Sequence, residues 1–113
     1  MAETIALIDF GAGNLHSVHS ALKAAGATGV TVTADPELVA KADRIILPGV
    51  GAFGACRDAL FGIDGMIETL EKRVLREATP FLGICVGMQL MAEYGVEHGT
   101  HDGLSWVAGS VEK

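Results

Sequence analysis

Short apolar stretches alternate with amphipathic stretches along the whole chain. Runs rich in apolar and β-branched residues, typical of buried strands, occupy 5–8, 30–33, 44–47 and 81–84. Helical spacing of apolar residues predicts helices at 15–25 and 36–42, two helical pieces between Gly54 and Pro80, and a helix from 85 to about Tyr94. Residues 104–107 and Val111 suggest a fifth strand or a hairpin.

This alternation predicts an α/β fold, a flavodoxin-like, doubly wound and mostly parallel sheet with right-handed crossovers. The 113 residues amount to one domain, and a mean hydropathy of +0.39 suits a well-buried core. In such folds, ligands gather at the carboxyl ends of the strands. Glycine-bearing turns at 11–14, 48–54 and 83–87 occupy that edge, so we expect an active site there.

The composition excludes several classes of partner. The net charge is −6 and no basic cluster is present, which argues against nucleic acid. Long uncharged runs, such as 45–56 and 78–92, are interrupted by Pro and Gly and are shorter than a membrane span. The amino terminus has no signal-like segment, so we expect a cytoplasmic chain. No cofactor is expected.

Residues 80–92 contain the most informative motif, an apolar strand followed by Gly-x-Cys-x-Gly and a helix. This is the layout of a nucleophile elbow, in which a tight turn lifts the side chain of Cys85 clear of the sheet. Gly83 and Gly87 flank the turn because larger side chains would collide with the strand or the helix. The alternative is a buried core cysteine. We interpret Cys85 as a nucleophile and Cys56, which lacks such a frame, as structural, and we expect both to be reduced.

Acyl chemistry at Cys85 needs backbone N–H donors for the oxyanion of the tetrahedral intermediate. One should come from the following residue, Val86, and a second from a neighbouring glycine-rich loop, at Val50 or Gly51. The turn at 11–14 is not a dinucleotide fingerprint, because His16 stands where the third glycine is needed.

The histidines give neither a metal site nor an evident base. His16 with His19, and His98 with His101, lack a third ligand at suitable spacing, so we expect surface histidines and no metal. A catalytic thiol needs a general base, and only His98 and His101 follow Cys85. We expect neither to reach it.

Leu82-Gly-Ile-Cys-Val-Gly-Met-Gln-Leu resembles the nucleophile motif of the class I, triad-type glutamine amidotransferases. Together with Ile8-Asp-Phe-Gly-Ala-Gly-Asn-Leu-His-Ser-Val and Pro48-Gly-Val-Gly-Ala-Phe-Gly, it is similar to the glutaminase subunits of imidazole glycerol phosphate synthases. The similarity covers residues 1–113 and only the amino-terminal half of that family's single domain. The resemblance places the family's catalytic His and Glu in the other half, so the fold would be incomplete at the carboxyl end and this chain alone inactive.

The resemblance also implies roles for individual residues. Cys85 would attack glutamine to form a thioester and release ammonia, with oxyanion donors from Val86 and a flippable strand at 48–51. Gly51 and Gln89 would hold the glutamine, and Gly11 and Asn14 would face the partner. That partner would be a (β/α)8-barrel cyclase subunit in a heterodimer, which uses the ammonia in histidine biosynthesis.

Two other functions are compatible with the motifs: a non-catalytic flavodoxin-like docking module and a different class I amidotransferase. A half-domain would also leave a sheet edge and apolar surface without cover. We therefore expect self-association of the chain.

Overall fold

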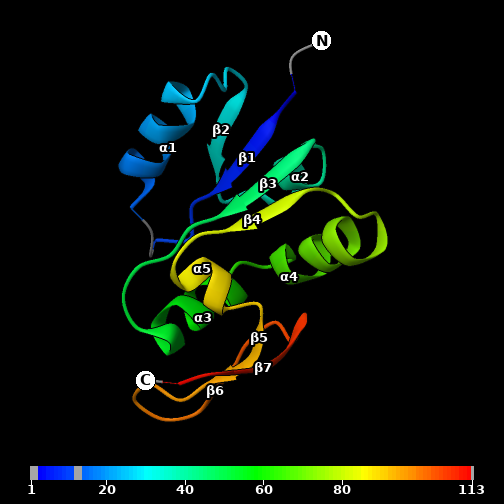
Figure 1. The fold of residues 1–113 in the computed structure, drawn as a ribbon. Helices are drawn as coiled ribbons and strands as arrows, with labels where there is room; N and C mark the ends of the chain where they lie inside the picture. Colours follow the sequence, from blue (N-terminus) through cyan, green and yellow to red (C-terminus); the bar gives the residue numbers. More distant parts are fainter. Residues whose placement is uncertain (1–2, 12–13, 113) are drawn as a thin grey trace.

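The structure is a computed structural model that describes residues 3–11 and 14–112. Its strands are β1 (Ile5–Ile8), β2 (Val30–Thr33), β3 (Arg44–Leu47), β4 (Phe81–Gly83), β5 (Ala92–Gly95), β6 (His101–Asp102) and β7 (Val107–Val111). The helices are α1 (Leu15–Ala24), α2 (Pro36–Val39), α3 (Phe53–Phe61), α4 (Met66–Leu70), the π-helical η1 (Glu71–Arg76) and α5 (Val86–Gln89). Figure 1 shows a larger sheet with helices on both faces and a small sheet below it.

The larger sheet has the strand order β2-β1-β3-β4, and every neighbouring pair is parallel. Ile5 lies beside Val30 on one side and Arg44 on the other, and Leu47 lies beside Gly83. The predicted α/β fold with a mostly parallel sheet is therefore confirmed. Since the strands are parallel, the turns after β1, β3 and β4 all leave the same edge.

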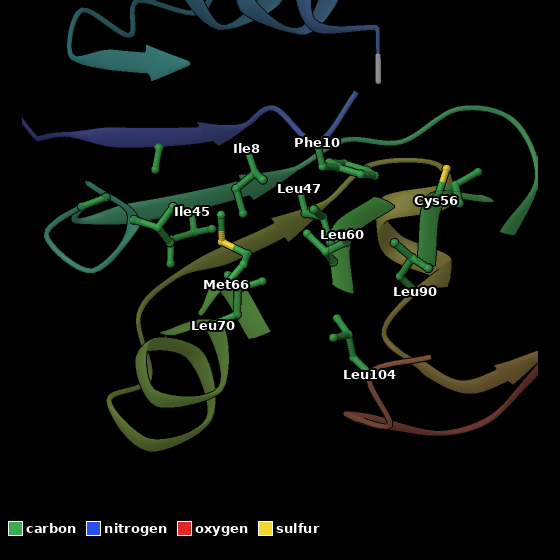
Figure 2. Close-up of a cluster of buried hydrophobic side chains, with 14 of the residues drawn as sticks. Ile8, Phe10, Ile45, Leu47, Cys56, Leu60, Met66, Leu70, Leu90 and Leu104 are labelled. Atoms are coloured by element: carbon green, nitrogen blue, oxygen red, sulfur yellow. The ribbon is translucent and has the colours of Figure 1, made fainter. Parts of the chain in front are cut away.

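One face of this sheet carries the hydrophobic core (Figure 2). Alternating strand residues point to this face because successive side chains of a strand lie on opposite sides. They meet buried side chains from α2, α3 and α4. The core includes Ile8, Ile45 and Leu47 from the strands and Val39, Leu60, Met66 and Leu70 from the helices, all 1% exposed or less.

The opposite face is only partly covered. It lies under α1, whose own residues include none that are buried. A groove of about 290 Å³ runs beside Leu22 of α1 and over Ile5, Ile46 and Leu82. Leu82, on the edge strand β4, is 54% exposed. The described residues thus leave the apolar edge of the sheet at Leu82 without cover, as expected.

The structure corrects one local prediction and adds detail to two others. The helix after Cys85 ends at Gln89 rather than near Tyr94, because Ala92–Gly95 forms strand β5. The strand expected in the tail is β7, which does not join the larger sheet. Instead, β5 pairs in parallel with β7 and antiparallel with β6 in a separate three-stranded sheet. Residues 71–76 are π-helical, continuing α4 with a wider turn.

Within residues 3–11 and 14–112, no helix is long and apolar enough to cross a membrane.

Candidate active site

The carboxyl edge of the larger sheet brings together the turns predicted to form the site. The turn after β4 is bonded to β3 by the Ile84 amide, which donates to the Leu47 carbonyl at 2.9 Å. The turn after β1 begins with Gly11, whose amide donates to the Asp9 carboxylate at 3.1 Å. Gly11 and Asn14 are both exposed, whereas Ala12 and Gly13 lie outside the described residues.

Cys85 has the backbone conformation of a nucleophile elbow. Its φ is 56° and its ψ −122°, a region that residues with a side chain rarely adopt. Such strain persists only where the surroundings impose it, and here β4 and α5 do so on either side. The Cys85 side chain is exposed at the start of α5. The sequence motif thus forms the predicted turn.

Both flanking glycines are required by close packing of backbone. A Cβ at Gly87 would lie 1.9 Å from the carbonyl oxygen of Leu47, at the end of β3. A Cβ at Gly83 would lie 2.7 Å from Cα of Met88 in α5. These distances are well inside van der Waals contact. Strand, turn and helix can therefore approach this closely only with glycine at both positions.

Val86, the first predicted oxyanion donor, is engaged by the neighbouring loop. Its amide donates to the carbonyl oxygen of Gly49 at 3.1 Å. The next two residues of that loop, Val50 and Gly51, are exposed, and Gly51 has a φ of +97°. The structure thus brings the two predicted donor segments together, with a carbonyl group beside the Val86 amide.

Gln89 lies one helical turn beyond Cys85. Its backbone N–H donates to the Cys85 carbonyl oxygen at 3.1 Å. It lines a pocket of about 200 Å³ together with Phe53, Glu97, Val111 and Glu112. The Glu97 carboxylate accepts a hydrogen bond from the Phe53 amide at 3.2 Å, which fixes it at the start of α3. The pocket therefore combines an amide side chain with two carboxylates next to the elbow.

Sequence reasoning missed Glu97. It lies 44 residues from Phe53 along the chain, and only the turn after β5 brings it to α3. A short-range motif carries no signal for such a contact.

The histidines that follow Cys85 are held elsewhere. The ring of His101 lies against Gly54 of α3, and its Nε2 is 3.2 Å from the carbonyl oxygen of His98. Among the described residues, no histidine hydrogen-bonds the Cys85 thiol. The described residues also contain no cluster of three or more His, Cys, Asp or Glu side chains that could bind a metal ion.

Cys56, interpreted as structural, is buried in α3 at 1% exposure. Its thiol donates to the carbonyl oxygen of Val50 at 3.2 Å. Burial raises the pKa of the Cys56 thiol, which keeps it protonated.

A parallel sheet that ends in a strained cysteine elbow, with a glycine loop hydrogen-bonded to the residue after the cysteine, is an arrangement typical of cysteine-dependent acyl-transfer proteins. The model of the class I glutamine amidotransferases matches residues 6–102. The chain belongs to this family.

Individual relatives narrow the comparison to one subunit within this family. The chain is 55% identical over 112 residues to a Zymomonas mobilis protein named imidazole glycerol phosphate synthase subunit HisH. It is 56% identical over 113 residues to the Rhodospirillum rubrum protein of that name, and 51% identical over 115 residues to that of Rhodopseudomonas palustris. These alignments cover 96–97% of this chain and 53% of each relative. The chain thus spans about half the length of the curated relatives that it matches.

Proposed function

We propose that this chain is the nucleophile-bearing, amino-terminal half of the glutaminase domain of an imidazole glycerol phosphate synthase. The observation that carries the proposal is the strained elbow of Cys85 with the Val86 amide 3.1 Å from the Gly49 carbonyl oxygen. An exposed thiol next to a potential oxyanion site suits attack on an amide. The similarity to HisH subunits supports glutamine as the substrate.

In the proposed reaction, the Cys85 sulfur attacks the side-chain carbonyl carbon of glutamine after losing its proton to a base. The tetrahedral intermediate collapses with cleavage of the C–N bond, and ammonia leaves after taking up a proton. The resulting γ-glutamyl thioester is hydrolysed by water, which releases glutamate and restores the thiol. Among the described residues, no histidine forms a hydrogen bond with the Cys85 thiol. We therefore assign the general base to the part of the HisH sequence that the alignment to this chain does not cover.

The loop after β3 must move before both oxyanion donors can act. The Val86 N–H already donates to the Gly49 carbonyl oxygen. A substrate oxyanion placed beside this N–H would therefore be repelled by the Gly49 oxygen. Rotation of the Gly49–Val50 peptide would withdraw this carbonyl and turn the Val50 N–H toward Val86. We therefore choose Val50 as the second donor, with Gly51 left to contact the glutamine.

The pocket at Gln89 suits the other end of glutamine. Free glutamine carries an ammonium group, and carboxylates are its natural partners in a protein. Glu97 lies in this pocket and Gln89 is one helical turn from Cys85. We propose that these two side chains hold the amino-acid end while the amide reaches the sulfur.

Ammonia would be passed to a (β/α)8-barrel cyclase subunit in a cytoplasmic heterodimer. The exposed residues Gly11 and Asn14 lie at the carboxyl edge of the sheet, which also carries Cys85, and we propose that this edge faces the barrel. A short path for ammonia requires the thiol and the partner to share that edge.

The test is glutamate release from glutamine in the assembled synthase, with the second half supplied from the Rhodospirillum rubrum relative and Cys85→Ala as the control. We expect turnover that needs both halves and Cys85. Turnover unchanged by Cys85→Ala would refute the assignment. Binding to the cyclase without any turnover would instead favour a docking module, and ammonia delivery to another acceptor a different amidotransferase.

A further inference from the structure

The thiol of Cys56 connects the core of the molecule to the loop beside the elbow. Cys56 lies on α3 among buried core side chains (Figure 2), and its sulfur donates to the Val50 carbonyl oxygen at 3.2 Å. The Val50 side chain itself is 51% exposed. The backbone of this loop residue is therefore tied to the core although its side chain is in solvent.

Two neighbouring peptides of the loop are held in different ways. The Gly49–Val50 peptide is bonded through its carbonyl to the Val86 amide, and the Val50–Gly51 peptide through its carbonyl to Cys56. Peptide units are planar, and one unit rotates by opposite changes in the ψ before it and the φ after it. The next unit can then stay in place, provided that something holds it.

We propose that Cys56 is a positioning residue that anchors the Val50–Gly51 peptide, so that rearrangement of the loop is confined to the Gly49–Val50 peptide. This inference rests on the proposed function, in which that rotation creates the second oxyanion donor. With Val50–Gly51 fixed, the rotating N–H of Val50 turns about a defined axis and stops beside the Val86 amide. Without the anchor, the rotation spreads along the loop and the two donors align less often.

The thiol is suited to this role. A buried thiol with a raised pKa remains an S–H donor over the physiological pH range. The hydrogen bond is weak, and its loss typically changes an equilibrium by about two- to five-fold. The role of Cys56 is thus to bias the loop, whereas Cys85 carries out the chemistry.

The experiment compares Cys56→Ala, Cys56→Ser and Leu60→Val. Leu60 is fully buried on the same helix, so Leu60→Val thins the same core and serves as the packing control. Glutamine hydrolysis is measured in the assembled synthase, and hydrogen exchange of the Val86 amide is measured in this chain. We expect Cys56→Ala to lower kcat about two- to five-fold at nearly constant KM and to speed Val86 exchange by a similar factor.

Cys56→Ser should restore both quantities, because a hydroxyl donates to the same carbonyl, and Leu60→Val should leave both unchanged. Equal effects of Cys56→Ala and Leu60→Val, or unchanged Val86 exchange in Cys56→Ala, would overturn the anchor. If the unaltered synthase released no glutamate, the proposed function would fail, and the exchange rates of Val86 would decide the anchor by themselves.

Discussion

Replacing Gly87 by alanine tests the geometry of the elbow most sharply. The new Cβ would lie 1.9 Å from the Leu47 carbonyl oxygen and 2.7 Å from its carbon. Ordinary C···O contacts are about 3.3 Å, so the helix and the strand must separate by about 1.4 Å. Both atoms belong to backbone, and no side-chain rotation can relieve the overlap. We expect the free energy of unfolding to fall by about 3 kcal/mol.

The same separation would act on catalysis. The amide of Val86 and the turn at Cys85 lie directly before Gly87, and a misplacement of about 1 Å can cost about 10²-fold in rate. We therefore expect Gly87→Ala to lose at least about 10²-fold in glutamine turnover, even under conditions where the variant is fully folded.

The assay pairs urea unfolding of this chain with glutamate release in the assembled synthase. Gly62→Ala is the matched control, since Gly62 has an ordinary φ of −73° and its Cβ would lie 3.1 Å from the nearest atom, the Asp58 carbonyl oxygen. We expect Gly62→Ala to change the unfolding free energy by at most about 1 kcal/mol. If Gly87→Ala were as stable and as active as this control, the close approach of α5 to β3 would be refuted.

Three further outcomes are expected. Cys85→Ala should abolish glutamine hydrolysis without changing the circular dichroism spectrum, and retained turnover would exclude Cys85 from the reaction. The Thr4 amide and hydroxyl donate to the Asp43 carboxylate and hold the pKa of this carboxyl below its usual value. The ionised carboxylate therefore stabilises the folded chain above about pH 4, and this contribution is lost as the pH falls through the lowered pKa. Asp43→Asn should accordingly lower the Tm at pH 7 and make little difference near pH 2; an equal difference at both pH values would contradict this. Because Leu82 is exposed on an edge strand, the chain should self-associate at high concentration and Leu82→Lys should reduce the association, as light scattering can show; a monomeric unaltered chain would argue otherwise.

The sequence predicted the larger sheet well because its signals are local. Each strand is a short apolar or β-branched run closed by a turn, and parallel pairing follows from the helices between the strands. The elbow was equally readable, since Gly83 and Gly87 report a close approach that only glycine permits.

Predictions failed where long-range contacts decide. The segment after Gln89 has helical spacing, but pairing of Ala92–Gly95 with β6 and β7 makes it a strand. The contact of Glu97 with Phe53, 44 residues apart, depends on a loop whose path no periodicity specifies. The bond from Cys56 to Val50 spans only six residues, but it too depends on the path of an irregular loop. The hydrogen bond from the Val86 N–H to the Gly49 carbonyl oxygen could not be predicted either. It depends on the orientation of the Gly49–Val50 peptide, which the local sequence does not specify.

The most direct test of the account is to locate the covalent intermediate. The assembled synthase is treated with an electrophilic glutamine analogue, which converts the transient thioester into a stable adduct, and the modified peptide is identified by mass spectrometry. We predict one adduct, on exposed Cys85, with buried Cys56 unmodified and with labelling slowed by excess glutamine. Labelling of Cys56 at an equal rate, or glutamine turnover that continues with Cys85 fully blocked, would contradict it.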